Sequence, residues 1–272
     1  MRPRFAPVVL TALATVTWGR AGLAQQPSRA DELLWSAPRA ELRHVDSLYH
    51  RFDVAASLTA AELLAQADST DREASWRVAR AALVLGLLAR EEEEQNVWYR
   101  RAEKHAARVV ARDSSEVEGL FWLAAARGRL ALQQGPRTTA ELAQQVWDLS
   151  HRVLALEPGH AGAHNILGKL NHEVMSLSRL ERFLARLVLG DNDVLRTASW
   201  EQAEHHHLSA TARDPGAVLY HYDLAQTYLR QGKQAEAAAE LRTVLALPAR
   251  YPPDPMWQAQ ARRRLARLED AR

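Results

Sequence analysis

Six histidines are the residues of this sequence best suited to bind a metal ion, because neutral imidazoles are common zinc ligands. His160 and His164 are four residues apart, and His172 and His205–His207 follow. Consecutive histidines on a helix point about 100° apart, so at most two of that triple could converge. Glu204 stands beside them, but the chain has no His-Glu-x-x-His motif. We therefore expect no metal site and no cofactor.

The motifs of other catalytic chemistries are not found in the sequence. There is no glycine-rich phosphate loop, no nucleophile elbow, and no serine with the local partners seen in hydrolases. The chain has no cysteine, which excludes disulfides, thiol catalysis and thiolate metal ligands. The acidic run Glu91–Glu94 is interpreted as a solvated turn and helix start. We therefore expect the protein not to be an enzyme.

The elements that must position any functional residue are helices. From about Arg39 onward, apolar residues recur at helical spacing, and no segment shows the strict alternation of a half-buried strand. The composition, with 47% hydrophobic and 25% charged residues, is that of a globular protein. Prolines and glycines divide the periodic stretches, at Gly135-Pro136, Pro158-Gly159, Pro215-Gly216 and Pro248. The sequence predicts an all-α fold.

The stretch 216–248 shows the clearest repeat unit. Ala225 and Ala237 are small enough to let two helices approach closely, and Gly232 allows a sharp turn between them. This spacing resembles the tetratricopeptide pattern, a helix-turn-helix of roughly 34 residues. The pattern recurs upstream and predicts a tetratricopeptide-like helical-repeat solenoid of about five helix pairs, closed by a C-terminal capping helix near 255–268.

One segment, 175–199, stands outside the repeat register. Its leucines and valine recur at three- and four-residue steps, which predicts an amphipathic helix. Insertions in solenoids often lie at a binding face, although simple core filling is an alternative role. The residues of this pattern are Leu177, Leu180, Leu184, Leu187 and Val188.

The N-terminus differs in character from the rest of the chain. Two arginines precede an apolar run from Phe5 to Trp18, and small residues precede Gln25. The run is shorter than the roughly 20 residues of a membrane-spanning helix, and this layout is typical of a cleavable secretory signal. We expect a periplasmic or secreted protein without a transmembrane span in the mature chain; a retained anchor is the alternative. The expected divisions are a signal peptide at 1–24, a flexible linker at 25–38 and the repeat domain at 39–272.

The charge balance argues against nucleic acid as a partner. Residues 1–24 contain three arginines and no acid, so the formal net charge of +2 belongs mainly to the signal. The remaining chain is close to neutral and lacks the broad basic field that phosphate backbones require.

Beyond the general repeat, a further set of motifs spans roughly 72–268, namely Trp76-Arg77, Ala79-Arg80, Ala163-His164, Leu167-Gly168-Lys169, Leu177-Ser178, Leu180-Glu181, Trp200, Ala203, Asp214-Pro215-Gly216, Gly232-Lys233 and Leu245-Ala246-Leu247-Pro248. In these motifs the chain resembles the bacterial relatives of the regulator of microtubule dynamics proteins. The resemblance implies a tetratricopeptide-like domain, which in one mitochondrial outer-membrane member is implicated in phospholipid binding and transfer. No lipid-contact residue can be carried over from these motifs, and microtubules are an implausible partner for an exported bacterial protein.

The repeat register also predicts which residues line a groove, because the first helix of each pair faces the concave side of such arrays. Cationic and amide side chains beside apolar ones suit a ligand with an anionic head and an apolar body, such as a phospholipid. The alternative is a protein-interaction adaptor in a cell-envelope complex, with a protein or peptide partner. The predicted groove residues are Arg77, Phe121, Arg129, Asn165, Lys169, His172, Tyr222, Gln226 and Arg230, with Ala81, Val84, Leu85, Ala125 and Leu229 as apolar lining.

Overall fold

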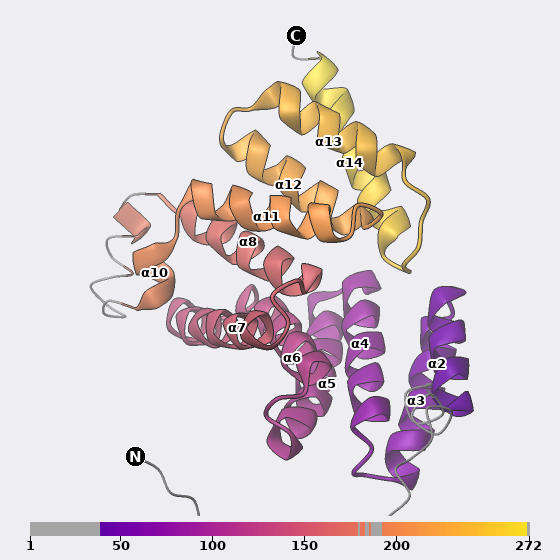
Figure 1. Ribbon diagram of the computed structural model, residues 1–272. Coiled ribbons are helices and arrows are strands. Elements are labelled where there is room, and N and C mark those ends of the chain that lie inside the picture. The colour runs from indigo at the N-terminus through magenta and orange to yellow at the C-terminus, as the bar shows by residue number, and fades with distance from the viewer. Residues whose placement is uncertain (1–38, 179, 183–184, 186–191, 271–272) are drawn as a thin grey trace, which may run out of the picture. The chain divides into compact units, whose positions relative to one another are not determined.

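The helical spacing of the sequence is realised as a series of α-helices (Figure 1). The computed structural model describes residues 39–178, 180–182, 185 and 192–270, which belong to one compact unit, Arg39–Arg272. This part of the chain contains no strand. Its helices are α2 (Ala40–His50), α3 (Val54–Ala67), α4 (Arg72–Leu88), α5 (Glu92–Arg112), α6 (Val117–Ala131), α7 (Pro136–Leu156), α8 (Ala161–Ser176), α10 (Asp193–Thr197), α11 (Trp200–Arg213), α12 (Val218–Arg230), α13 (Gln234–Ala246) and α14 (Asp254–Asp270).

The expected signal peptide and linker fall in the other unit, Met1–Pro38, which lies outside the described residues. Among the helices that are described, none combines the length and the apolar character needed to cross a bilayer.

Local sequence signals set the ends of the helices. The side chains of Asp53, Asp71 and Ser199 each accept a hydrogen bond from the backbone N–H three residues on, which satisfies a donor that has no partner inside the helix. Pro136 opens α7, where its missing N–H costs nothing. Gly232 has a φ of +78°, a left-handed conformation that favours glycine, and it makes the turn between α12 and α13.

The helices pack as consecutive pairs, namely α2 with α3, α4 with α5, α6 with α7, α8 with α11, and α12 with α13. The first helices of the pairs, α2, α4, α6, α8 and α12, also contact one another in chain order, and α12 contacts α14. We call these first helices the inner helices and their partners the outer helices. Ala225 and Ala237 are fully buried at the seam of the last pair, as their small size predicts. The five-pair repeat fold with a C-terminal helix is confirmed.

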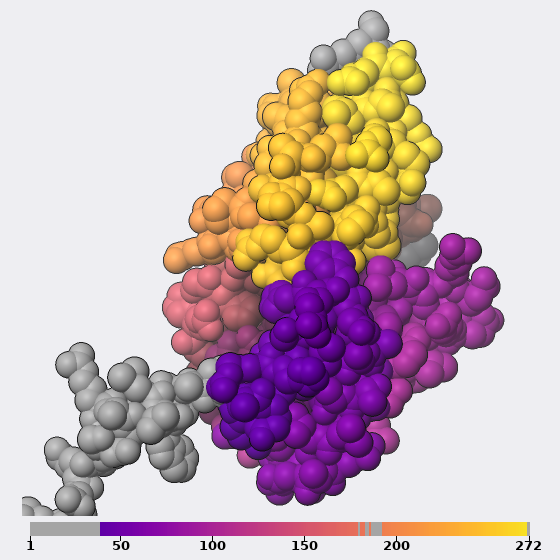
Figure 2. Space-filling view, turned by 90° about the vertical axis from the view of Figure 1, so that its right-hand side faces the viewer, coloured from indigo at the N-terminus to yellow at the C-terminus, as the bar shows by residue number. Residues whose placement is uncertain are grey.

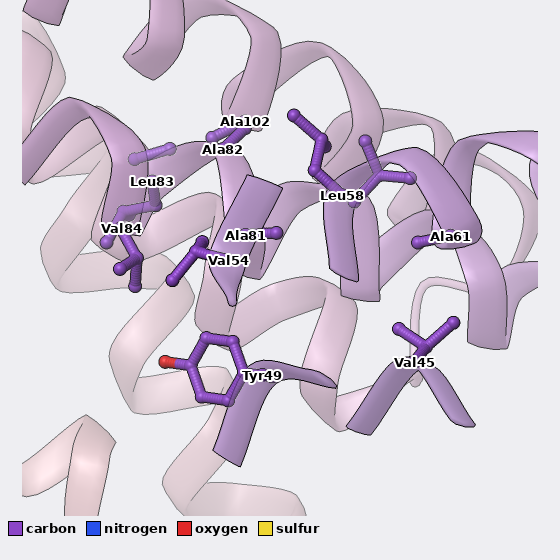
Figure 3. Close-up of a cluster of buried hydrophobic side chains, with 12 residues drawn as sticks. Val45, Tyr49, Val54, Leu58, Ala61, Ala81, Ala82, Leu83, Val84 and Ala102 are labelled. Carbon is purple, nitrogen blue, oxygen red and sulfur yellow. The ribbon is translucent and has the colours of Figure 1, made fainter. Parts of the chain in front are cut away.

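The core of the first two pairs illustrates how the array is held together. Figure 3 shows Tyr49, Val54 and Leu58 turned toward Val84 and its neighbours on α4. Each is at most 5% exposed, and burying a side chain such as Leu58 contributes about 1.5–3 kcal/mol. Ala81 is also buried in this cluster, where a larger side chain would force the helices apart.

The first and last pairs of the repeat domain meet. Tyr251, in the loop between α13 and α14, packs against the buried cluster of α2 and α4, and its ring lies 5.9 Å from that of His50. Figure 2 shows the indigo and yellow segments in contact on one face. Arg250 anchors the same loop by donating to Asp214 Oδ1 over 2.9 Å. The C-terminal capping helix is therefore tied to the start of the array as well as to α12 and α13.

The insertion at 175–199 is described in part. Leu177 and Leu180 are 39% and 65% exposed. The Ser178 hydroxyl and the Glu181 carboxylate accept reciprocal backbone hydrogen bonds, a capping box that starts a helical turn. Leu184, Leu187 and Val188, which complete the predicted amphipathic pattern, lie outside the described residues. The short helix α10 then packs on α7 and α8.

Candidate functional site

A buried carboxylate, Asp223 on α12, lies at the centre of the polar residues between α8 and α12. Its side chain is 8% exposed, and Asn165 Nδ2 donates to its Oδ2 over 3.0 Å. Lys169 Nζ lies 3.9 Å from Asp223 Oδ1 and 3.1 Å from Glu173 Oε1. Burial alone would lower the pKa of Lys169, but the two carboxylates outweigh it and raise that pKa. The lysine is therefore held charged, with its side chain 36% exposed.

His207 on α11 orients Asn165 from behind. Its Nδ1 lies 3.1 Å from Asn165 Oδ1 and must donate, since an amide oxygen only accepts. Burial lowers the pKa of His207 to about 4, so the imidazole is neutral near pH 7. Gly168 makes room for this ring, because a Cβ at that position would lie 2.7 Å from it. The amide donor of Asn165 is thereby directed at Asp223.

His172, two turns from Asn165 on α8, is also held neutral. Its Nδ1 lies 3.0 Å from Thr227 Oγ1, and its ring meets that of Trp200 edge-on with the centroids 5.6 Å apart. Burial, followed by the charge of Lys169, lowers the pKa of His172 to about 4. It can offer a ligand an uncharged ring and a hydrogen bond.

Three donors around this group have no carboxylate partner among the described residues. Gln226 Nε2 is buried without any hydrogen bond. Arg230 is exposed and donates to the backbone oxygen of Ser176 over 2.9 Å. Arg129 on α6 is half-buried and close enough to Lys169 that its charge lowers the pKa of that lysine.

These residues carry three cations, Arg129, Lys169 and Arg230, against two carboxylates, Asp223 and Glu173. The surplus is positive, so an anionic group would be favoured there. We call the set the inner cluster, consisting of Arg129, Asn165, Lys169, His172, Glu173, Asp223, Gln226 and Arg230.

Exposed leucines mark the ends of three successive inner helices. Leu88, the last residue of α4, is 42% exposed, Leu132 at the end of α6 is 58% exposed, and Leu177 at the end of α8 is 39% exposed. Inner helices of consecutive pairs run in the same direction, so their equivalent ends lie along one edge of the array. Arg129 and Arg230 occupy the last turns of α6 and α12, at these same ends.

Arg77, predicted to line the same groove, lies in a different group of side chains. Its Nε donates to both oxygens of Asp46 on α2, at 3.0 and 3.1 Å, and its Nη1 pairs with Glu73. Arg80 Nη2 also donates to Asp46, over 2.7 Å. Arg77 stacks on the ring of Trp76 at 4.0 Å and is 4% exposed. Its donors are thus taken by acids of the chain itself, an arrangement that the repeat register does not reveal. We call Asp46, Glu73, Trp76, Arg77 and Arg80 the α2–α4 cluster.

Phe121 and Tyr222, two further predicted groove residues, pack against neighbouring helices. The ring of Phe121 lies 4.8 Å from that of His160 and covers Gly162, where a Cβ would meet it at 2.5 Å. Tyr222 is 4% exposed, and its hydroxyl donates to Gln260 Oε1 on α14 over 2.8 Å. The structure does not place either ring in the inner cluster.

The residues predicted as apolar lining divide in the same way. Ala81 and Val84 are buried in the core of the first two pairs (Figure 3). Leu85, Ala125 and Leu229 are only partly buried.

The histidines of α8 and α11 contact one another and the backbone of the fold. His164 Nδ1 lies 3.0 Å from His206 Nδ1, whereas His160 accepts the hydrogen bond that caps α8. No group of three or more potential ligands occurs among the described residues. Burial, followed by the charge of His164, lowers the pKa of His206 to about 3.

Two features of the structure were not predicted from the sequence. Asp223 follows a predicted groove position directly, but it is turned toward α8, and only the contact with Asn165 shows that it organises the cluster. The second is a row of basic residues on α5, an outer helix that carries none of the predicted groove residues. The sequence already contains this row as a spacing of three and four residues, which places one basic residue on each successive helical turn. The residues are Arg101, Lys104, Arg108 and Arg112.

Comparisons with known proteins agree with the repeat fold. Residues 42–269 match the family described as regulator of microtubule dynamics protein 1-3, which confirms the expected resemblance. Regulator of microtubule dynamics protein 3 from Bos taurus is 25% identical over 174 residues, covering 64% of this chain and 36% of that protein. The chain thus spans about a third of that relative's length.

A solved structure shows the same fold. The crystal structure of a thermophilic TPR protein from Thermus thermophilus is 22% identical, with a TM-score of 0.59 over 83% of this chain and 97% of that one. At this identity the likeness concerns the fold alone.

Proposed function

This chain belongs to the regulator of microtubule dynamics family, and from that premise we propose that it is a non-enzymatic binding scaffold. Its ligand is amphipathic and anionic, of the phospholipid kind, and the inner cluster binds the anionic head. The observation that carries this proposal is the surplus of cations in the inner cluster, two of which, Arg129 and Arg230, lie at the same helix ends as three exposed leucines.

The chemistry of the inner cluster supports an anionic head. Guanidinium and ammonium groups form charge-assisted hydrogen bonds to phosphate or carboxylate oxygens. Lys169 is kept charged by Asp223 and Glu173, while the amide of Gln226 supplies a buried donor without a partner. Filling such a donor is favourable, because a buried polar group without a hydrogen bond costs about 1–3 kcal/mol.

The leucines at the inner-helix ends support an apolar body. Leu88, Leu132 and Leu177 each expose a large apolar side chain at the C-terminal end of an inner helix. A ligand whose head meets Arg129 or Arg230 could cover these leucines with its chain, and each buried methylene would contribute about 0.8 kcal/mol.

Vesicle binding tests this proposal. The protein would be mixed with vesicles of phosphatidylglycerol or of phosphatidylcholine, and bound lipid would be measured by native mass spectrometry after the vesicles are removed. We expect uptake of the anionic lipid and about tenfold weaker uptake by the Lys169→Ala, Arg230→Ala double variant.

The matched control is the Arg262→Ala, Arg263→Ala double variant, which removes the same charge from exposed positions of α14. Its uptake should equal that of the unchanged protein. An empty protein after exposure to both lipids would overturn the lipid proposal, as would equal uptake by the two double variants. Binding of acidic peptides without lipid uptake would instead identify a peptide partner.

We also propose that the protein acts in the periplasm or outside the cell. The support is the N-terminal layout of two arginines, a short apolar run and small residues before Gln25. Edman sequencing of the protein from the native envelope should give an N-terminus near Gln25, and an intact Met1 in the soluble cytoplasmic fraction would contradict export.

A further inference from the structure

A cavity opens between the outer helices α3 and α5, away from the inner cluster. It has a volume of about 440 Å³ and is lined by Ala65, Ser69, Ser75, His105, Arg108, Ala111 and Arg112. A second cavity of about 260 Å³ continues it toward Glu62, Arg101 and Lys104. Both share Ala65, His105 and Arg108, so they form one trough, which we call the outer trough.

The floor of the outer trough comes from the helix between the two outer helices. Ser75, on α4, is 4% exposed and lies beneath the walls that α3 and α5 provide. Because α4 packs on both α3 and α5, the separation of these two outer helices is set by the repeat itself. The hollow is therefore a fixed feature of the first two pairs.

The α5 wall carries a row of positive charge. Arg101, Lys104, Arg108 and Arg112 recur at steps of three and four residues and so project from one face of the helix. Arg101 pairs with Glu62 on α3. The other three have no acidic hydrogen-bond or ion-pair partner within the part of the chain that is described, and all three are exposed.

This row contrasts with several basic residues elsewhere in the fold. Arg77, Arg127 and Lys233 each meet a carboxylate of the chain. Like charges spaced by four residues on a helix repel one another, so leaving three of them unpaired beside a hollow opposes folding. An anion in the outer trough would relieve that repulsion.

His105 lines both cavities, and the positive charges of α5 act on its ring. Its Nδ1 is buried without a hydrogen bond. Burial, and then the charges of Arg108, Arg101 and Lys104, lower the pKa of His105 to about 4. The neutral imidazole of His105 therefore has a ring nitrogen without a hydrogen-bond partner beside several cations. A bound anion would accept a hydrogen bond from it.

The geometry points to the outer trough as a second binding site, for a phosphate monoester held by Arg108 and Arg112. Planar guanidinium groups match the geometry of phosphate oxygens. The hydroxyls of Ser69 and Ser75 add uncharged hydrogen-bond donors. The volume exceeds the need of a bare phosphate, and Ala65 and Ala111 leave room for a compact body such as a sugar. This site lies on the outer helices and does not depend on the function proposed for the inner cluster.

Calorimetric titration with glucose 6-phosphate, inorganic phosphate and glucose tests the proposal. We expect saturable binding of glucose 6-phosphate, weaker binding of inorganic phosphate and none of glucose. Replacing both guanidinium groups, in the Arg108→Ala, Arg112→Ala variant, should weaken glucose 6-phosphate binding by at least about tenfold. The ring proton shifts of His105 should move with occupancy in the unchanged protein.

The single variant Arg108→Ala is compared with a matched control, Arg100→Ala, which lies on the same helix but outside the lining of either cavity. This control should leave the affinity unchanged, and equal weakening by Arg100→Ala and Arg108→Ala would reduce the effect to a general basic surface and overturn the site. Failure to bind any phosphate compound would overturn it too, including the case in which only an acidic peptide binds.

Vesicles containing phosphatidic acid form a second arm, which distinguishes a lipid headgroup from a soluble phosphate. Binding to these vesicles that depends on Arg108 and Arg112, with no binding of glucose 6-phosphate, would support the site and assign its phosphate to a headgroup. Because Lys169→Ala, Arg230→Ala leaves the outer trough intact, that variant should retain its phosphate binding whatever becomes of the inner cluster.

Discussion

Two groups of basic side chains on the inner helices differ in whether carboxylates of the chain neutralise their charge. In the α2–α4 cluster, Arg77 and Arg80 are at most 10% exposed at the side chain and share the carboxylate of Asp46. In the inner cluster, Lys169 is 36% exposed and Arg230 is exposed with a backbone oxygen as its partner. The first group holds two helices together, whereas the second retains donors that no carboxylate of the described residues takes up.

The difference lies in the acids that neighbouring helices supply. Asp46 reaches Arg77 and Arg80 from α2, and both guanidinium groups also stack on aromatic rings. In the inner cluster, Asp223 contacts both Asn165 and Lys169. Arg129 on α6 and Arg230 on α12 are left without a carboxylate partner among the described residues. A basic residue at an inner position therefore indicates binding only where the next helix does not neutralise it.

The largest effect should come from removing the acid of the α2–α4 cluster. Asp46→Asn keeps the shape of the side chain but leaves Arg77 and Arg80 with less compensation, so the free energy of unfolding should fall by about 3 kcal/mol. Urea unfolding of the variant and the unchanged protein measures this loss. Asp148→Asn, an exposed acid on α7, should cost less than about 0.5 kcal/mol. Equal effects of the two substitutions would remove the distinction between the clusters.

A second test concerns the close approach that supports the inner cluster. Gly168→Ala would put a Cβ 2.7 Å from the His207 ring, and we expect a loss of about 2 kcal/mol as that ring shifts. Gly128→Ala, on the inner helix α6, meets no atom nearer than 3.9 Å and should be neutral or stabilising, because alanine favours helix. Urea unfolding of both variants gives the two free energies of unfolding. No loss of stability in Gly168→Ala would show that the His207 ring is not tightly held.

Acid should weaken the buried histidines of α8 and α11 and the α2–α4 cluster in different pH windows. The pKa values of His172 and His207 are about 4 and that of His206 about 3, below the unfolded value of about 6.5. Their contribution to stability is therefore present above pH 6.5 and is lost as the pH falls through that value toward 4. Asp46 also has a lowered pKa, since Arg77 and Arg80 outweigh its burial, and its contribution is lost only below about pH 3.8.

We expect a loss of about 1 kcal/mol per buried imidazole when the pH falls one unit below 6.5. His221 opposes this, because Glu240 outweighs its burial and raises its pKa, but it is one group against several. Urea unfolding at about pH 7.5 and pH 5.5 provides the comparison. The His206→Asn variant should show a smaller loss than the unchanged protein, and equal stability at the two pH values would contradict the assignment of neutral buried histidines.

The fold could be predicted because its signals are local. Small residues such as Ala225 and Ala237, the glycine at 232 and the prolines between helices each act within one repeat, and the structure places them as the pattern indicates. The repeat register also identified Asn165, Lys169 and Arg230 as inner residues of two facing helices.

The partners of the inner residues could not be predicted, because they come from distant parts of the chain. Arg77 and Asp46 are 31 positions apart, and Asn165 and Asp223 are 58 positions apart. A register gives the face on which a side chain lies, but it does not show whether a neighbouring helix supplies an acid. The outer trough was missed for the same reason, since it exists only where α3, α4 and α5 meet.

Arg77→Ala and Arg230→Ala, compared for stability and for uptake of phosphatidylglycerol in one set of samples, test the central claim most directly. Arg77→Ala should lower the free energy of unfolding by about 2–3 kcal/mol with uptake by the folded protein unchanged. Arg230→Ala should reduce uptake several-fold and change stability by less than about 0.5 kcal/mol. The reverse pattern, with Arg77 needed for uptake and Arg230 only for stability, would contradict the account.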